Sequence, residues 1–312
     1  MTPAIDLLDL HKKYARHMAV DGLNLSIEPG SVFGLIGPNG AGKTTTLRMI
    51  LDIIRPTSGA VRVFGEDPRA AGPSLRRRIG FIPGELRLEG RMTGRRMLDF
   101  YVEVSGPVRA GAIDELSSRL GLDLTRPVHT LSKGNKQKLG IVQAFMHEPE
   151  LLVLDEPTSG LDPLVQREFI QLLREARERG QTVLLSSHVL SEIQQTADAV
   201  AVLSDGRIVA EGDVASLRLG AIRRVRAGFS GVGADVLRAE LMVLPHVADI
   251  EVTTSNEVVR LAATVEGDID PFVKVIARHR LIDLAVEEPD LEESVLRLYG
   301  SPDSTTRGAD RA

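Results

Sequence analysis

Residues 31–50 read SVFGLIGPNGAGKTTTLRMI, and this stretch decides the fold. The apolar run Ser31–Ile36 predicts a buried strand. Apolar residues then recur at positions 47, 50, 51 and 54, which predicts a helix over Lys43–Ile54 with one buried face, ended by the turn-forming segment Pro56–Gly59. Between strand and helix, Gly37–Thr44 matches G-x-x-x-x-G-K-[ST], the pattern of a phosphate-binding loop.

The residue types of this loop explain its chemistry. Glycines allow successive backbone N–H groups to curl around phosphate oxygens, and the start of the following helix adds a favourable dipole. Lys43 can reach the β and γ phosphates of a nucleotide, and the hydroxyl of Thr44 suits Mg²⁺. A glycine-rich turn that fits by chance is the alternative, and the flanking strand and helix argue against it.

A pair of carboxylates marks a second candidate site. Residues 151–156 read LLVLDE, an apolar strand that ends in two acidic residues. Ligands bind at the carboxyl ends of strands in parallel sheets, so Asp155 suits the metal and Glu156 suits a polarised water. Such a pair is by itself more often a solvated strand end, but the phosphate loop upstream favours the catalytic interpretation.

Composition bounds the class of protein. The 312 residues would fill two unequal domains, and 43% hydrophobic with 26% charged residues is typical of a globular chain rather than a disordered or fibrous one. A formal net charge of -5 argues against a nucleic-acid partner. We interpret the three arginines at 76–78 as a solvated face.

Several absences indicate the compartment. No apolar run approaches the roughly 18 to 20 residues that cross a bilayer, so we expect no transmembrane span. The first residues lack the basic-then-apolar plan of a secretory signal, and there is no cysteine, which suits a reducing compartment. We therefore expect a cytoplasmic protein.

The first two thirds of the chain alternate short strand-like runs with helical periodicity, which predicts an α/β fold with a mostly parallel sheet. The strand candidates are Ser31–Ile36, Ile79–Pro83, Leu151–Asp155, Thr182–Ser186 and Ala199–Leu203. Residues from about Gly90 to Gly121 read as a mainly helical insertion that Pro107 interrupts.

After Leu219 the pattern changes. Strand-like and helix-like runs follow in the order βαββαβ, which predicts a small α+β, ferredoxin-like domain. The strands are expected at Ile222–Phe229, Val247–Thr254, Val258–Val265 and Leu281–Glu287, and the helices at Ala234–Val243 and Asp270–His279. An amphipathic stretch at Asp290–Tyr299 should pack on this domain through Leu291, Val295 and Leu298.

We therefore expect a first domain over residues 1–219, with a helical subdomain at about 86–148. A C-terminal accessory domain should occupy residues 220–300, and residues 301–312 should form a disordered tail.

Three further segments narrow the class. Residues 131–137 read LSKGNKQ, residues 155–163 read DEPTSGLDP, and His188 ends the run LLSSH. In this order they resemble the signature motif, the second carboxylate motif with its D-loop, and the switch histidine of ATP-binding-cassette (ABC) ATPases. The resemblance covers about residues 4–217, and Tyr14 matches the family's adenine-stacking aromatic.

This resemblance implies a P-loop ABC ATPase fold with N-terminal antiparallel strands, and two copies of the chain that sandwich ATP and Mg²⁺. In the family, the γ-phosphate on one subunit's phosphate loop meets the partner's signature motif. The implied nucleotide contacts are Tyr14, Gly37, Pro38, Asn39, Gly40, Ala41, Gly42, Lys43, Thr44, Thr45, Ser132, Gly134 and Asp162. Thr44 and Asp155 would hold the metal, and Glu156 and His188 would serve ATP hydrolysis.

The sequence departs from the family pattern at two places. Signature positions that usually carry Gly and Gln hold Lys133 and Asn135, which alters the polarity of the contact with the partner. The glutamine expected after the strand that ends at Pro83 is Gly84, followed by Glu85. That glutamine normally touches Mg²⁺ and links the nucleotide site to a membrane partner. Either Glu85 substitutes one position later, or water completes the metal shell.

The segment from Gly84 to Gly94 and the C-terminal domain resemble ABC subunits that drive antibiotic and multidrug exporters of the daunorubicin-resistance kind. This implies a separate membrane permease, contacting residues around 84–105, and a peripheral position on the inner face of the cell membrane. Alternatives are import, regulation of a membrane complex without transport, or a soluble ABC ATPase acting on nucleic acid or ribosomes. Nothing in the sequence selects the transported substrate.

Overall fold

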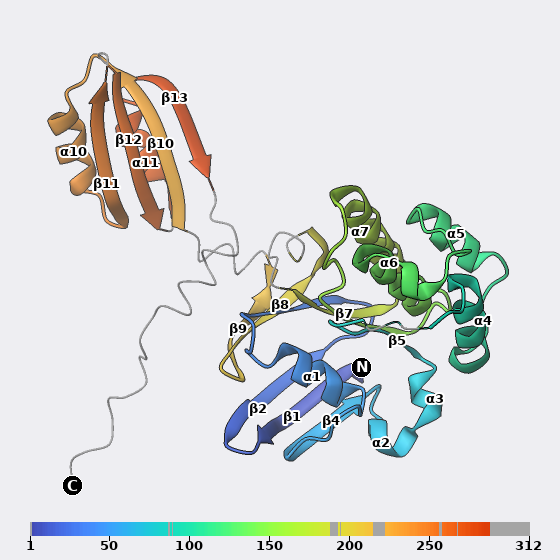
Figure 1. The fold of residues 1–312 in the computed structure, drawn as a ribbon. Coiled ribbons are helices and arrows are strands. Elements are labelled where there is room, and N and C mark those ends of the chain that lie inside the picture. The colour runs from blue at the N-terminus through green and yellow to red at the C-terminus, as the bar shows by residue number, and fades with distance from the viewer. Residues whose placement is uncertain are drawn as a thin grey trace, which may run out of the picture. The chain divides into compact units, whose positions relative to one another are not determined.

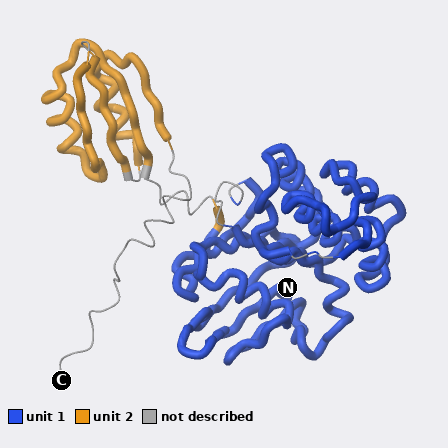
Figure 2. Tube along the Cα trace, viewed as in Figure 1, with its two compact units in different colours: residues 1–212 blue, residues 213–312 orange. Residues whose placement is uncertain are grey.

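The computed structural model describes residues 2–86, 88, 90–187, 193, 195–214, 222–255, 258–266 and 268–287. The chain divides into two compact units, residues 1–212 and 213–312 (Figure 2). The predicted boundary at residues 219 and 220, the stretch Asp290–Tyr299 and the tail 301–312 lie outside the described residues, so those expectations stay predictions.

A six-stranded sheet organises the first unit, and its strands run in the order β5-β6-β7-β3-β8-β9. The four pairs of neighbours from β5 to β8 are all parallel in their register, which confirms the predicted α/β class. The strands are β3 (Val32–Ile36), β5 (Ile79–Ile82), β6 (Leu151–Asp155), β7 (Thr182–Ser187), β8 (Ala199–Ser204) and β9 (Arg207–Asp213). β3, β6 and β7 are buried along their whole length, as expected for strands covered on both faces.

A second sheet of three antiparallel strands lies beside it (Figure 1). Its order is β2 (His17–Ile27), β1 (Ile5–Tyr14) and β4 (Ser58–Val63), which matches the N-terminal antiparallel strands that the resemblance implies. Helix α1 (Lys43–Ile50) contacts β2, β4 and β6, and one apolar core joins it to both sheets.

The predicted helix after the phosphate loop is shorter than expected. We predicted Lys43–Ile54, but α1 ends at Ile50, and Leu51 caps it. Asp52 then adopts a left-handed φ of 53°, which turns the chain back before Ile54. The apolar residues at 51 and 54 still pack against the core, although only the first of them adjoins the helix, so the periodicity located the buried face but overestimated the helix.

Helices cover the face of the parallel sheet that lies opposite α1 (Figure 1). The predicted insertion holds α4 (Gly94–Ser105) and α5 (Ala112–Arg119), separated around Pro107. A 3-10 turn, η1 (Val128–Thr130), leads into α6 (Lys133–Phe145), and α7 (Pro163–Glu178) follows β6. Two short helices, α2 (Pro68–Ala71) and α3 (Pro73–Arg76), connect β4 to β5.

One ion network ties this helical layer together. The guanidinium of Arg119 on α5 donates to Glu168 at 2.6 Å and to both carboxylate oxygens of Glu175 at 2.7 and 2.8 Å. These hydrogen bonds raise the pKa of Arg119 and hold the pKa of Glu175 below its ordinary value. Because the contact is bidentate and less than a quarter of the Arg119 side chain is exposed, it fixes α5 against α7.

The second unit has the predicted βαββαβ order. Its strands are β10 (Ile222–Ser230), β11 (Val247–Ser255), β12 (Val258–Glu266) and β13 (Arg280–Glu287), and its helices are α10 (Ala234–Met242) and α11 (Asp270–Ile276). The sheet order β11-β12-β10-β13 is antiparallel throughout, as in a ferredoxin-like fold. Phe229 and Phe272 lie in a separate apolar core of this unit.

Among the residues that the structure describes, no helix has the length and apolar character needed to span a membrane.

Candidate nucleotide-binding site

The phosphate loop connects β3 to α1, as its sequence predicts. Two of its glycines are sterically required. A Cβ on Gly37 would lie 2.5 Å from the carbonyl oxygen of Leu203, and a Cβ on Gly42 would lie 2.5 Å from that of Ala19. Gly42 also has a left-handed φ of 107°. The backbone therefore curls tightly between β2 and β8, and it leads into the start of α1, where the N–H groups of a first helical turn can bind an anion.

Lys43 lies at the centre of this loop and is only 6% exposed. Its ammonium donates to the carbonyl oxygens of Gly37 at 2.5 Å and Pro38 at 3.2 Å. The Nζ atom also lies 3.8 Å from the Glu156 carboxylate. Burial lowers the pKa of Lys43, while the negative charges of Glu156 and Asp155 oppose that shift. A buried cation held by backbone carbonyls is positioned to exchange them for phosphate oxygens.

Asp155 ends β6 and Glu156 follows it, so both carboxylates lie near this lysine. Asp155 is 2% exposed, and its Oδ1 accepts a hydrogen bond of 2.6 Å from the hydroxyl of Ser186 on β7. Glu156 has a left-handed φ of 49°, and its backbone N–H donates to the Ser186 hydroxyl at 3.2 Å. Backbone strain of this kind is common at functional sites. The hydrogen bonds to Ser186 thus hold the Asp155 side chain and the Glu156 backbone in place at the end of β6.

The oxygen ligands fit a magnesium ion. Thr44 is half-buried at the start of α1, and Asp155 supplies a carboxylate that Ser186 orients. Among the described side chains there is no cluster of three or more His, Asp or Glu residues able to enclose a metal. Mg²⁺ usually takes one or two protein ligands and completes its shell with phosphates and water, so a threonine hydroxyl and one carboxylate are ligands of the right kind and number.

The signature segment begins α6, and its contacts in this chain are structural. Ser132 caps the helix by accepting the N–H of Asn135 at 3.3 Å. Lys133 donates to the hydroxyl of Ser159 at 3.1 Å, and a Cβ on Gly134 would lie 2.7 Å from the carbonyl oxygen of Gly160. The start of α6 is therefore packed on the segment that follows the carboxylates.

The remaining predicted site residues have mixed placements. Tyr14 ends β1, is 45% exposed, and lies under the Lys12 ammonium at 5.0 Å from its ring centroid. Asp162 caps α7 by accepting the N–H groups of the next turn. Thr45 is half-buried in the first turn of α1. His188 lies outside the described residues.

Two residues of the site were not predicted from the sequence. Ser186 holds Asp155, and the side chain of Gln137 on α6 is buried and donates to the Pro157 carbonyl at 2.8 Å. Ser186 carried a usable signal, because a polar residue at the end of an apolar strand next to β6 faces the same sheet edge. Gln137 ends the signature-like segment 131–137, but its burial could not be predicted, since one glutamine on an amphipathic helix is ordinarily exposed.

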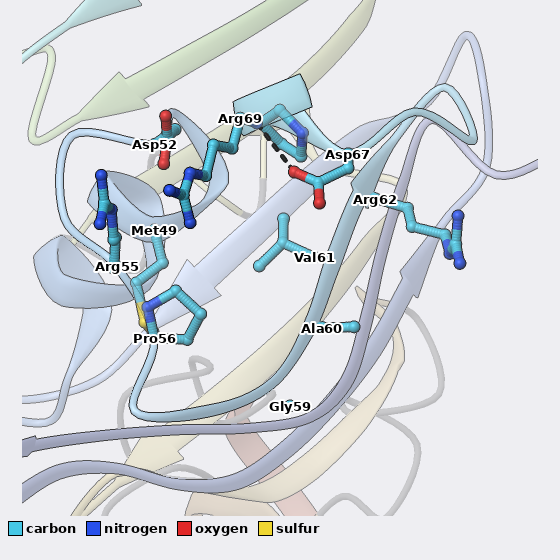
Figure 3. Close-up of a pocket in the computed structure, with 11 residues that line it drawn as sticks. Met49, Asp52, Arg55, Pro56, Gly59, Ala60, Val61, Arg62, Asp67 and Arg69 are labelled. Carbon is cyan, nitrogen blue, oxygen red and sulfur yellow. Dashed lines mark hydrogen bonds between the residues drawn. The ribbon is translucent and has the colours of Figure 1, made fainter. Parts of the chain in front are cut away.

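A hollow of about 300 Å³ lies at the opposite end of α1 from the phosphate loop (Figure 3). Met49 and Val61 form part of its wall, and Asp52, Arg55 and Arg69 bring charge to it. None of the residues predicted to hold nucleotide line it, so it is separate from the candidate site.

Comparison with known proteins agrees with this geometry. Residues 20–159 match the family model described as ABC transporter. The chain is 41% identical over 214 residues to the bacitracin transport ATP-binding protein BcrA of Bacillus licheniformis, covering 68% of this chain and 70% of that one. It is 36% identical over 275 residues to the daunorubicin/doxorubicin resistance ATP-binding protein DrrA of Streptomyces peucetius, covering 86% and 79%.

A solved structure supports the fold. The dimeric post-hydrolysis cassette MJ0796, bound to ADP and Pi, superposes with a TM-score of 0.62 at 24% identity and covers 67% of this chain and 98% of that one. Together with the phosphate loop, the paired carboxylates and the signature helix, these relatives show that the chain belongs to the ATP-binding, ATP-hydrolysing subunits of ABC transporters.

Proposed function

We propose that this chain hydrolyses ATP as a homodimer and thereby powers export through a separate membrane permease. The observation that carries the proposal is the buried Lys43 ammonium, held in the phosphate loop 3.8 Å from Glu156 and beside Asp155. A cation, two carboxylates and a curled backbone are the parts that phosphoryl transfer from ATP requires.

Each residue has a distinct part in the proposed reaction. Lys43 exchanges its carbonyl partners for the β and γ phosphate oxygens and stabilises their charge. Thr44 and Asp155 would hold Mg²⁺, which neutralises phosphate charge when bound. Glu156 orients the attacking water and accepts its proton, and His188 contacts the γ-phosphate. Tyr14, half exposed at the end of β1, offers a ring face for the adenine.

The signature turn supplies the second half of the nucleotide site to a partner copy. Ser132 is exposed and Gly134 is half-exposed, so the start of α6 is accessible to another molecule. Free N–H groups in a first helical turn attract anions, and the γ-phosphate bound to the partner is such an anion. The dimeric state of the related MJ0796 cassette supports this arrangement. ATP then joins two copies, and hydrolysis releases them.

The hydrolysis step is tested with Glu156→Gln, which keeps the shape of the side chain but removes its basicity. We expect turnover to fall by roughly 10² to 10⁴, the usual range for loss of a general base, while ATP affinity changes little. Glu178→Gln, at the exposed end of α7, is the matched control and should leave turnover unchanged. Turnover above a tenth of wild type in Glu156→Gln would remove Glu156 from this role.

The surface around residues 84–105 supports a permease contact. Phe100 and Val104 project one turn apart on α4 and are 57% and 49% exposed, and Met92 nearby is 46% exposed. The same part of the chain contributes Gly84, Glu85, Leu86 and Leu88 to a hollow of about 410 Å³, whose other wall is the start of α6. Exposed apolar side chains are typical of a docking surface. This contact would place the chain on the cytoplasmic face of the membrane.

The permease contact is tested by co-expressing the chain with the membrane protein encoded beside it. Phe100→Asp should reduce recovery of the chain with membranes at least tenfold, without altering ATP binding by the isolated chain. Ile53→Asp is the control, because Ile53 is also 54% exposed but lies after α1. Equal loss in both variants would show a general folding effect instead.

The cargo is proposed from the relatives. The names of BcrA and DrrA assign them to bacitracin transport and to daunorubicin/doxorubicin resistance. We infer that this chain likewise serves efflux of an antibiotic. Expression together with its permease should raise the inhibitory concentration of such compounds, and Glu156→Gln should abolish that increase. An unchanged inhibitory concentration across peptide and anthracycline antibiotics would contradict the efflux assignment.

A further inference from the structure

Gly84 occupies the position where the family resemblance leads us to expect a glutamine, and the structure gives a steric reason for the change. A Cβ added to Gly84 would lie 2.8 Å from Oδ2 of Asp155 and 3.1 Å from its Cγ. Real Cβ atoms essentially never approach another heavy atom within 3.0 Å. Any side chain at position 84 must therefore displace the Asp155 carboxylate.

Asp155 has little freedom to move away. Its side chain is buried at 2% exposure, and its second oxygen accepts the Ser186 hydroxyl at 2.6 Å. The two residues are also direct neighbours in the parallel register of β6 and β7. A residue larger than glycine at position 84 would have to break this hydrogen bond or move the strand end.

The loop is held on its other side as well. Leu86 packs against α6 so closely that a Cβ on Gly140 would lie 2.7 Å from Cδ2 of Leu86. Glu85 is exposed and lines the hollow of about 410 Å³ together with Lys133, Lys136 and Gln137 of α6. Glu85 thus lies on the side of the loop that faces α6.

We propose that Gly84 is a positioning residue, which keeps the Asp155 carboxylate in place for the metal, and that neither position 84 nor Glu85 gives the metal a side-chain ligand. Water then takes the place of the missing glutamine in the shell. This inference rests on the proposed function, because it concerns the Mg²⁺ that accompanies ATP. It differs from the family pattern, in which the same loop position reaches the metal.

The test measures Mn²⁺ binding by electron paramagnetic resonance, with ATP present and in a Glu156→Gln background that prevents turnover. Gly84→Ala and Gly84→Gln should each weaken Mn²⁺ binding by about tenfold or more, as is typical when a group that orients a metal ligand is disturbed. Glu85→Gln should change it less than twofold. Gly233→Ala is the matched control, since the nearest atom to its added Cβ would be 3.9 Å away.

Two measurements keep the outcomes separate. Thermal unfolding and metal-free ATP binding show whether each variant is folded. Tighter or unchanged Mn²⁺ binding by Gly84→Gln would overturn the inference, and so would a tenfold loss in Glu85→Gln. If the Glu156→Gln parent binds neither ATP nor Mn²⁺ with ATP, the proposed function itself fails and the inference falls with it.

Discussion

The phosphate loop and the signature turn are both glycine-containing starts of helices, yet the chain treats them differently. In the loop, Lys43 is buried and Gly37 and Gly42 have no room for a side chain. In the turn, Ser132 is exposed, and its hydrogen bond caps its own helix. The first half of the site is thus enclosed within one chain, whereas the second half faces outward. This difference fits the proposal that a second copy of the chain completes the site.

The largest expected effect on ATP binding comes from changing the enclosed half. Lys43→Ala removes the cation that would bind the phosphates, and charged hydrogen bonds are each worth about 1.5 to 3 kcal/mol. We expect ATP affinity to fall roughly 10- to 100-fold, measured with a fluorescent ATP analogue. Arg48→Ala, exposed on the same helix, should bind ATP as wild type does. Equal affinities for Lys43→Ala and Arg48→Ala would refute the role of Lys43.

A smaller and more selective effect should follow from changing the outward half. Ser132→Asp keeps a good helix cap but places a negative charge where the partner's γ-phosphate would bind. We expect monomer affinity for ATP to stay within about twofold, while ATP-driven dimerisation in a Glu156→Gln background weakens at least tenfold. Sedimentation velocity measures the dimer, and Ser132→Asn is the neutral control. Normal dimerisation of Ser132→Asp would show that the signature turn does not contact the partner's nucleotide.

The packing beneath the turn should affect stability more than binding. Gly134→Ala forces a Cβ to within 2.7 Å of the Gly160 carbonyl oxygen, and overpacking of this kind costs about 1 to 3 kcal/mol. The free energy of unfolding, from urea titration, should fall by that amount. Asn135→Ala, at the next position, should change it by less than about 0.5 kcal/mol. A Gly134→Ala protein as stable as wild type would show that α6 can move off the segment after Glu156.

The smallest effect concerns pH. Burial lowers the pKa of Lys43 below its ordinary value of 10.5, so the unfolded chain binds this proton more tightly than the native chain does. The buried ammonium is destabilising below the native pKa, and that cost disappears as pH rises toward 10.5. Lys43→Met should therefore unfold at a higher urea concentration than wild type at pH 7, and the gap should narrow toward pH 10. If the difference between the two urea midpoints widened as pH rises, the buried ammonium would not be destabilising.

Periodicity and spacing predicted much of the fold. The expected strands at Leu151–Asp155 and Ala199–Leu203 are present to within one residue, because buried parallel strands are short continuous apolar runs bounded by polar residues. The βαββαβ order of the second unit was predictable for a related reason. Apolar and polar residues alternate along its strands, whereas apolar residues recur every three or four positions along its helices. The predicted end of the helix at Ile54 was wrong, because the left-handed turn at Asp52 has no sequence signal as strong as glycine or proline.

The candidate site was predictable as a set of residues but not as an arrangement. A motif gives Lys43 and Glu156, but their 3.8 Å approach depends on β3 and β6 lying in one sheet with β7 between them. The approach of Gly84 to Asp155 depends likewise on β5 pairing with β6. Contacts between residues about 70 or more positions apart are set by the strand order, and no local pattern encodes that order.

We propose that each nucleotide is held between two copies of the chain, and a mixing experiment tests this directly. Lys43→Ala has a defective phosphate loop and Ser132→Asp a defective signature turn, both in a Glu156→Gln background. Radiolabelled ATP retained after rapid gel filtration is measured for each variant alone and for the mixture. We expect that neither variant retains ATP alone, whereas the mixture does, because one of the two sites in a mixed dimer combines an intact loop with an intact turn. A mixture that retains no more than either variant, while the parent protein retains ATP, would contradict it.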